Sequence, residues 1–284
     1  MAALADAARR RHHRGMSRDD ASTAALLGLA DPPPVELLRR DGAARLLILC
    51  DHASCAVPAS LAGLGLDAAS RRQHIGWDIG AAAVTRRLSG LLDAPAVLAG
   101  YSRLVIDCNR SPADPTAIPA VSDGVTVPGN AGLDAAARAA REAACFAPYH
   151  AAIARELAGF AVRGVVPVVL SIHSFTPVMQ SFARPWHVGI LWDKDPRVPV
   201  PLIAALAADP ARNVGDNQPY SAREPAGYSI HTHAASAGLP HAAVEIRQDL
   251  IAEAAGQRGW AAILADALAP ILARPGLHRV EHFR

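Results

Sequence analysis

Val165-Val166-Pro167-Val168-Val169-Leu170-Ser171-Ile172-His173 and Ala242-Ala243-Val244-Glu245 are the two stretches that decide the fold. Each is a short apolar or β-branched run with an ionisable side chain at its end. In an open α/β sheet, ligands bind at the carboxyl ends of the strands, where side chains emerge into a crevice. A histidine and a glutamate at one such edge suit a metal-assisted hydrolase, the first as a ligand and the second as a general base. The two stretches therefore predict an active site.

Two further segments repeat this pattern. Leu46-Leu47-Ile48-Leu49 leads into Cys50-Asp51-His52, and Arg103-Leu104-Val105-Ile106 leads into Asp107-Cys108-Asn109-Arg110, with 104–106 expected as a short strand. Further strands are expected at 94–98 and 188–192, and helices at 67–92, 133–162, 199–208 and 251–272. Strands that alternate with helices are typical of a sheet covered on both sides. We expect an α/β fold with a mixed, mostly parallel sheet.

Length and composition favour one globular domain. The chain has 284 residues, 51% hydrophobic and 19% charged, which suits a single α/β domain at 41–284 after a partly flexible leader at 1–40. The net charge of +2 is too close to neutral to indicate a nucleic-acid or membrane partner. The aromatic content of 5% also disfavours the stacking platforms of proteins that bind single strands.

The cysteines and the N-terminus bear on the compartment. The four cysteines form no Cys-x-x-Cys pair, which favours free thiols in a reducing environment. Residues 1–20 lack the apolar core and cleavage site of a secretory signal. No apolar run is long enough to span a bilayer. We expect a cytoplasmic protein.

His52 and His173 are the first candidate metal ligands, because each follows a buried strand and imidazole is the usual zinc ligand. A catalytic zinc site takes three protein ligands and leaves one position for water. Asp78 is a candidate for the third ligand, since a charge within an otherwise apolar helix is costly unless something pairs with it. Cys55, three residues after His52, is the other candidate. A structural role for His52 and a plain salt bridge for Asp78 are the alternatives.

Glu245 is the candidate general base, because a carboxylate at the end of an apolar strand can have a raised pKa. The alternative is a buried ion pair with Arg247, two residues on and therefore on the same face of the strand.

Arg103 comes directly before another predicted strand, and Asn109 and Arg110 follow that strand. Arginine binds carboxylates in a bidentate manner, so these groups suit a substrate with a free carboxylate beside an amide. Structural salt bridging is the alternative for either arginine.

Taken in order, these segments resemble the N-formylglutamate amidohydrolase family. The matching pieces are Cys50-Asp51-His52-Ala53-Ser54, His74-Ile75-Gly76-Trp77-Asp78-Ile79-Gly80, Ser102-Arg103-Leu104-Val105-Ile106-Asp107-Cys108-Asn109-Arg110, Ser171-Ile172-His173-Ser174-Phe175, Asp216-Asn217-Gln218-Pro219-Tyr220 and Val244-Glu245-Ile246-Arg247-Gln248-Asp249. The resemblance implies a three-layer αβα sandwich like that of the zinc carboxypeptidases. It covers roughly residues 45–275.

The resemblance also implies roles for particular residues. It makes His52 and His173 ligands of Zn²⁺ and Glu245 the general base. Arg103 would polarise the scissile carbonyl, and the substrate would be bound by Asn109, Arg110, Arg247, Asn217 and Tyr220. Carboxypeptidase-like sites take their second ligand from a glutamate three residues after the first histidine, where this chain has Cys55. Cell-wall amidases instead use an acidic residue from a following helix, which favours Asp78.

The implied reaction is zinc-dependent hydrolysis of a small N-acyl amino acid, with N-formyl-L-glutamate giving formate and L-glutamate as the leading case. One alternative is an amidohydrolase that acts on another N-acyl amino acid or on a peptidoglycan-type amide. The other is a non-catalytic, metal-free binding protein, which the departure at Cys55 makes conceivable.

Overall fold

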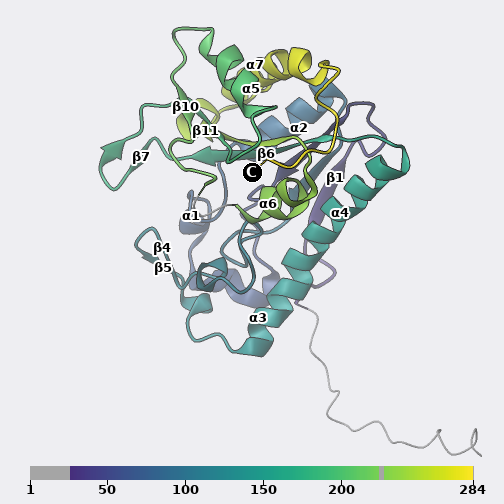
Figure 1. Ribbon diagram of the computed structural model, residues 1–284. Coiled ribbons are helices and arrows are strands. Elements are labelled where there is room, and N and C mark those ends of the chain that lie inside the picture. Colours follow the sequence, from purple (N-terminus) through teal and green to yellow (C-terminus); the bar gives the residue numbers. More distant parts are fainter. Residues whose placement is uncertain (1–25, 224–226, 284) are drawn as a thin grey trace, which may run out of the picture.

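A mixed seven-stranded sheet forms the centre of the molecule (Figure 1). The computed structural model describes residues 26–223 and 227–283. The strands lie in the order β1 (Val35–Leu38), β3 (Ala96–Ala99), β2 (Leu46–Cys50), β6 (Val168–Phe175), β11 (His241–Arg247), β9 (Val188–Leu191) and β10 (Val214–Asp216). Four of the six pairings are parallel, while β1 with β3 and β11 with β9 are antiparallel. The predicted mixed, mostly parallel sheet is confirmed.

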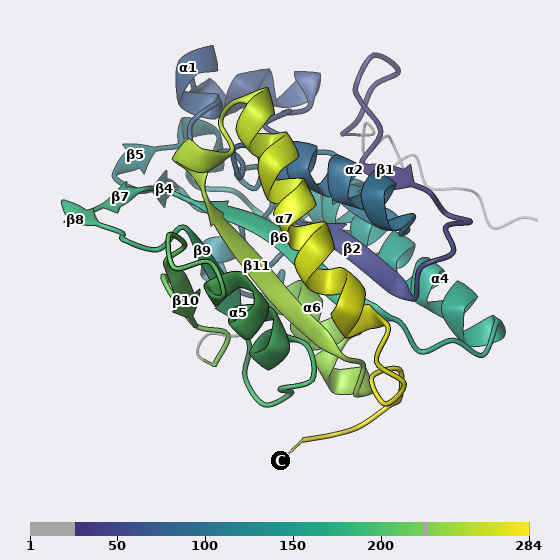
Figure 2. The same ribbon diagram turned by 90° about the horizontal axis from the view of Figure 1, so that it is seen from above.

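Helices cover both faces of this sheet. One face packs against α2 (Ala81–Leu92), α5 (Pro199–Ala207) and α7 (Ala254–Leu272), which lie over the sheet in Figure 2. The other face packs against α4 (Ala147–Val162) and α6 (Tyr228–His233). The alternation of strand side chains explains the two cores, since Leu170 and Ile172 face α2 and α7 while Val169 faces α4. The structure is therefore the expected three-layer α/β sandwich.

The α4 face of the sheet is not apolar along its whole width. Under α4 it presents Leu47, Leu49 and Val169. Toward β11 the same face carries Ser171, His173 and Glu245, as the side-chain alternation of β6 and β11 requires. Polar side chains at this position need partners or a solvent-filled space. The functional residues are therefore expected on this face, at the carboxyl ends of β2, β6 and β11.

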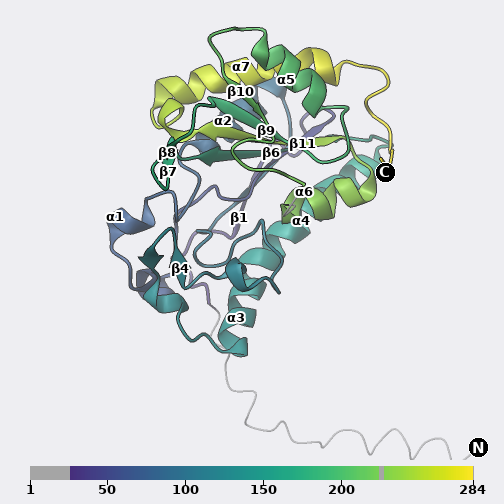
Figure 3. The same cartoon turned by 60° about the vertical axis from the view of Figure 1, so that its left-hand side comes forward.

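A smaller group of elements lies beyond the carboxyl ends of these strands, toward the bottom of Figure 3. It has its own apolar cluster, which includes Leu104, Ile106 and Phe146. Its elements are α1 (Ala68–Arg71), the hairpin of β4 (Val121–Ser122) and β5 (Val125–Thr126), and α3 (Ala135–Arg141). Helix α3 continues through a π-helical turn at Glu142–Phe146 into α4. A second hairpin, β7 (Val178–Met179) with β8 (Phe182–Ala183), follows β6. Short 3-10 segments lie at Ala59–Gly65, Pro115–Ala117, Pro128–Asn130, Ala235–Ala237 and Gln248–Leu250.

Two expected elements differ from the structure. The helix expected over 67–92 is two helices, α1 and α2, and Asp78 lies in the turn between them. The second helix begins after Gly80, which has a φ of +82° and packs against the backbone of Ile251, where a side chain would collide. The strand expected at 104–106 is a buried turn, because these apolar residues pack into the smaller cluster rather than the sheet.

The leader expected at residues 1–40 lies only partly within the residues that the structure describes. Residues 1–25, which include the basic cluster of the expected leader, lie outside them. The leader was expected to extend to residue 40, but Val35–Leu38 forms β1 and pairs with β3. All four cysteines are free thiols. In the part of the chain that the structure describes, no helix has the length and apolar character needed to cross a membrane.

Candidate metal centre and substrate cavity

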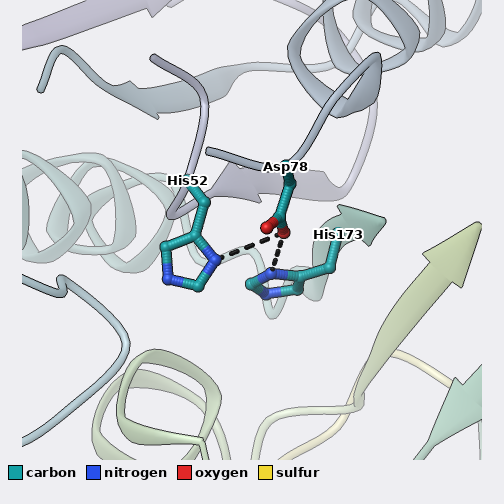
Figure 4. A group of neighbouring side chains, drawn as sticks. All are labelled: His52, Asp78 and His173. Carbon is teal, nitrogen blue, oxygen red and sulfur yellow. Dashed lines mark hydrogen bonds and ion pairs between the residues drawn. The ribbon is translucent and has the colours of Figure 1, made fainter. Parts of the chain in front are cut away.

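His52, Asp78 and His173 converge at the carboxyl ends of β2 and β6 (Figure 4). Nδ1 of His173 lies 2.9 Å from Oδ2 of Asp78, and Nδ1 of His52 lies 3.2 Å from the same oxygen. One potential ligand atom from each residue lies within 4.8 Å of the others, and all three residues are buried. The structure thus brings together the three residues that the sequence indicated as metal ligands.

The far side of each imidazole ring is bound to a second carboxylate. Nε2 of His52 lies 2.7 Å from Oδ1 of Asp107, and Nε2 of His173 lies 3.0 Å from Oδ2 of Asp51. Histidine ligands of metals usually donate their other N–H to a carboxylate or a carbonyl, which fixes the ring and its tautomer. Both rings are therefore oriented with Nδ1 toward Asp78.

The charges at this cluster suit a cation. Burial by itself would raise the pKa of Asp78, yet the neighbouring His52 and the hydrogen bond from His173 hold it well below its usual range. Against the effect of burial, hydrogen bonds to Asp51 and Asp78 raise the pKa of His173 well above its usual value. Four buried carboxylates, those of Asp51, Asp78, Asp107 and Glu245, surround the two histidines and Arg103. Buried charges are normally paired or bound to metals, so this donor set fits a divalent ion.

Cys55 does not join this cluster. It is half-buried and lines a separate shallow cavity with Val57 and Arg71. Among the residues that the structure describes, the one cluster with metal-ligand geometry contains Asp78 and not Cys55. His74 also lies outside this cluster, and its Nε2 is 2.9 Å from Oδ2 of Asp123. The geometry therefore favours Asp78 as the third ligand.

Glu245 lies beside the cluster, because β11 pairs in parallel with β6 and places Glu245 opposite His173. Its side chain is buried, and Oε2 has no hydrogen-bond partner within the described residues. Burial, with a contribution from Asp78, raises the pKa of Glu245 to about 7. The alternative ion pair with Arg247 is absent from the described residues, since Arg247 pairs with Asp249 at 2.8 Å. Glu245 is therefore a carboxylate without a structural partner.

Arg103 is held in place by Asp107. Its Nε and Nη2 donate to Oδ2 of Asp107 at 3.0 and 2.6 Å, and its Nη1 lies 3.6 Å from Oδ1 of Asp78. Asp107 thus binds His52 through one oxygen and Arg103 through the other. A single buried carboxylate fixes a candidate metal ligand and a guanidinium relative to each other.

A cavity of about 760 Å³ opens over these groups. Its lining includes His52, Asp78, His173, Glu245, Arg103, Asn109, Arg110 and Tyr220. Within the part of the chain that the structure describes, the guanidinium of Arg110 makes two long ion pairs, both of 3.8 Å, with Asp107 and Asp114. The side chain of Asn109 accepts a hydrogen bond from the backbone N–H of Ser229, at the start of α6. The structure thus brings these sequence-predicted residues to one cavity.

Two of the expected substrate-binding residues lie outside the lining of this cavity. Oδ1 of Asn217 accepts hydrogen bonds from the backbone N–H groups of Trp192 and Ala222, at 3.0 and 3.1 Å. It therefore supports the loop that carries Tyr220. Arg247 donates to Asp249 and to the carbonyl oxygen of Arg184. The structure thus gives both residues contacts within the chain rather than an open position in the cavity.

Asp51 and Asp107 hold the two histidines, although no local sequence pattern indicates this role. Asp51 is fully buried and accepts hydrogen bonds from Ser171 at 2.8 Å, from Tyr149 at 3.0 Å and from Ser229. A charged residue directly after the buried strand β2 was a signal that some partner had to exist. The identity of those partners depends on the tertiary fold.

Comparisons with known proteins show the family of the chain. A family model described as N-formylglutamate amidohydrolase matches residues 44–252. A gene product from Agrobacterium tumefaciens, known as a crystal structure, is 35% identical over 87% of this chain and 98% of its own, with a TM-score of 0.84. The N-formylglutamate amidohydrolase from Ralstonia eutropha is 20% identical over 85% of this chain and 97% of its own; its TM-score of 0.64 supports the fold alone. No curated protein matches the chain. The family match spans most of the chain, which belongs to the N-formylglutamate amidohydrolase family.

Proposed function

We propose that the protein hydrolyses the amide bond of an N-formyl or N-acyl amino acid, with N-formyl-L-glutamate as the leading substrate and Zn²⁺ as the cofactor. The observation that carries the proposal is the buried carboxylate of Glu245, whose Oε2 has no hydrogen-bond partner among the described residues and which lies beside the His52–Asp78–His173 cluster. A buried carboxylate without a hydrogen bond is costly to the fold, which favours a catalytic use. Family membership supports an amidohydrolase.

Zinc fits the donor set better than a harder cation. Two imidazole nitrogens and one carboxylate oxygen are common ligands of catalytic zinc, and three protein ligands leave a position open. Magnesium and calcium prefer sites built of oxygen ligands alone. When bound, zinc would polarise the scissile carbonyl and lower the pKa of the attacking water.

Glu245 would act as the general base. Its pKa of about 7 allows it to accept a proton from the attacking water near neutral pH. The same carboxyl group would then donate this proton to the nitrogen of the leaving amine. Its parallel register with His173 places it at the edge of the cluster, where both transfers would occur.

Arg103 and Arg110 would serve different parts of the substrate. The guanidinium of Arg103, fixed by Asp107, would stabilise the negative charge that develops on the carbonyl oxygen. Arg110 has donor groups without close partners in the described residues, so it would bind the carboxylate of the amino acid in a bidentate manner. The neighbouring Asn109 and Tyr220 also line the cavity and would complete the binding site.

The test is the release of formate and amino acid from a panel of N-formyl and N-acetyl amino acids. The protein is first depleted of metal with a chelator and then reloaded with Zn²⁺, and the Glu245→Gln variant is assayed in parallel. We expect turnover only with the reloaded wild-type protein. If the zinc-loaded protein hydrolyses no member of the panel, the proposal is wrong.

A further inference from the structure

The cavity continues beyond the metal cluster along β11. His241, Ala243 and Glu245 alternate onto the same face of this strand, and all three line the cavity. With a rise of roughly 3.3 Å per residue, the Cα atoms of His241 and Glu245 lie about 13 Å apart. A formyl group occupies only the first few ångströms of that distance. We refer to this extension, lined by Ala243, Leu191, Trp192, Ile230, Ala235 and His241, as the β11 arm.

The middle of the β11 arm is apolar and open. Ala243 pairs with Leu191 of the antiparallel strand β9, and Trp192 follows. Ile230 of α6 and Ala235 also line it. The small side chain of Ala243 leaves the space above the strand unfilled. Such walls suit a hydrocarbon chain, since each buried methylene contributes roughly fourfold to binding.

The far end of the arm offers a hydrogen-bond acceptor. His241 is 7% exposed, and its Nδ1 lies 2.7 Å from the carbonyl oxygen of Leu239, so Nδ1 donates to that oxygen. Burial lowers the pKa of His241, which favours the neutral ring. When the neutral ring carries its proton on Nδ1, Nε2 can only accept a hydrogen bond, and Nε2 has no partner among the described residues. The arm therefore ends in an unused acceptor.

Under the proposed function, the amino-acid part of the substrate would be bound away from the arm. Arg103 and Arg110 both contact Asp107, which holds His52 at the end of β2. The arm starts at Glu245 on β11, which is separated from β2 by β6. A substrate whose carboxylate is bound at the arginines and whose carbonyl lies at the cluster would extend its acyl group toward the arm.

Building on the proposed hydrolysis of N-acyl amino acids, but departing from N-formyl-L-glutamate as its leading case, we propose that the β11 arm is an acyl subsite. The preferred substrate would carry a linear apolar acyl group, longer than formyl, that ends in a donor to Nε2 of His241. The metal cluster and the arginines would be common to all substrates of the site. The arm would decide which acyl group is preferred.

The experiment measures binding separately from turnover. Calorimetry on the zinc-loaded Glu245→Gln variant gives Kd values for four glutamate derivatives, with formyl, acetyl, hexanoyl and terminally hydroxylated hexanoyl groups. We expect the hexanoyl derivative to bind at least about tenfold more tightly than the formyl one. The terminal hydroxyl should add about two- to tenfold through the bond to His241. Wild-type kcat/KM for the same series should follow this order.

Two substitutions locate the effect in the arm. Ala243→Leu, with Ala243→Val as the milder version, should reduce the advantage of hexanoyl over formyl by about tenfold or more, because the new side chain fills the arm. Ala158→Leu, at an exposed position of α4, is the matched control and should leave that ratio as it is. His241→Phe keeps a ring but removes the acceptor, so it should abolish only the gain from the hydroxyl group.

Equal affinities for the formyl and hexanoyl derivatives would overturn the acyl subsite, as would equal losses for both in the Ala243 variants. Failure of the proposed function gives a different pattern. If hexanoyl binds more tightly and Ala243→Leu removes this advantage, but no derivative is hydrolysed by the zinc-loaded wild type, the arm is supported as a binding site and the hydrolase is contradicted.

Discussion

Nε2 of His52 lies 2.7 Å from Oδ1 of Asp107, and both side chains are buried. The second oxygen of the same carboxylate accepts two hydrogen bonds from Arg103. Asp107 thus connects a residue proposed to bind the metal with a residue proposed to stabilise the transition state. A loss of its charge should affect both functions at once.

Asp107→Asn is the direct test of this relationship. Asparagine has the same shape, but its neutral amide gives His52 a weaker acceptor and releases Arg103. Partners that orient metal ligands typically contribute about 10–100-fold to metal affinity, so we expect a loss of that size. Competition with a zinc chelator measures it, and Asp266→Asn, at an exposed position of α7, is the control. Wild-type affinity together with wild-type kcat would show that Asp107 is not needed to position either partner.

Removal of either histidine ligand should remove the metal. We expect His52→Ala and His173→Ala to purify without stoichiometric zinc and without activity, because two remaining ligands hold the ion weakly. Elemental analysis gives the zinc content, and circular dichroism shows that the variants remain folded. His282→Ala, an exposed histidine, is the control. If both single variants keep one zinc per chain, the assignment of these ligands is wrong.

The identity of the third ligand is tested by a pair of variants. Asp78→Ala should weaken zinc binding strongly, since Oδ2 of Asp78 faces Nδ1 of both histidines. Cys55→Ala should leave zinc binding near the wild-type level, because Cys55 lines a separate cavity. Titration of zinc into the metal-free proteins compares the two. The reverse result would assign the ligand to Cys55.

The strands of the site could be predicted well from the sequence. β2, β6 and β11 are largely buried, and each contains an apolar run, at 46–49, 168–170 and 242–244, that differs from the surrounding helices and loops. The polar residues that end these runs predict His52, His173 and Glu245 as site residues, and the structure brings all three to one cavity. Asp78 lies there too, but in a turn and not within the expected helix.

Interactions between distant segments could not be predicted in the same way. Asp51 meets Ser229, which is 178 residues away, and Asp107 meets His52 across 55 residues. No local pattern in the sequence records such contacts. The apolar run at 104–106 predicts a strand where the structure has a buried turn, because such a run shows that a segment is buried but not which core it joins.

Glu245→Gln should separate catalysis from metal binding. Glutamine keeps the size of the side chain but cannot accept and return a proton, so we expect kcat to fall by about 10²–10⁴-fold. Zinc content should stay at the wild-type level, because Glu245 is not part of the ligand cluster. Steady-state kinetics and elemental analysis on the same preparation provide both values. Near-normal kcat in this variant would exclude Glu245 as the general base.

Arg110→Lys tests the recognition of the substrate carboxylate. The guanidinium of Arg110 lines the cavity and has no close partner among the described residues, so it can bind a carboxylate with two parallel hydrogen bonds. The ammonium group of lysine reproduces this geometry poorly. A charge-assisted bond contributes roughly 1.5–3 kcal/mol, so KM for acidic N-formyl amino acids should rise by about ten- to a hundredfold. An uncharged amide analogue should be affected much less. Equal losses for the two substrates would mean that Arg110 supports the fold or the carbonyl, and that Arg103, which also lines the cavity, binds the carboxylate instead.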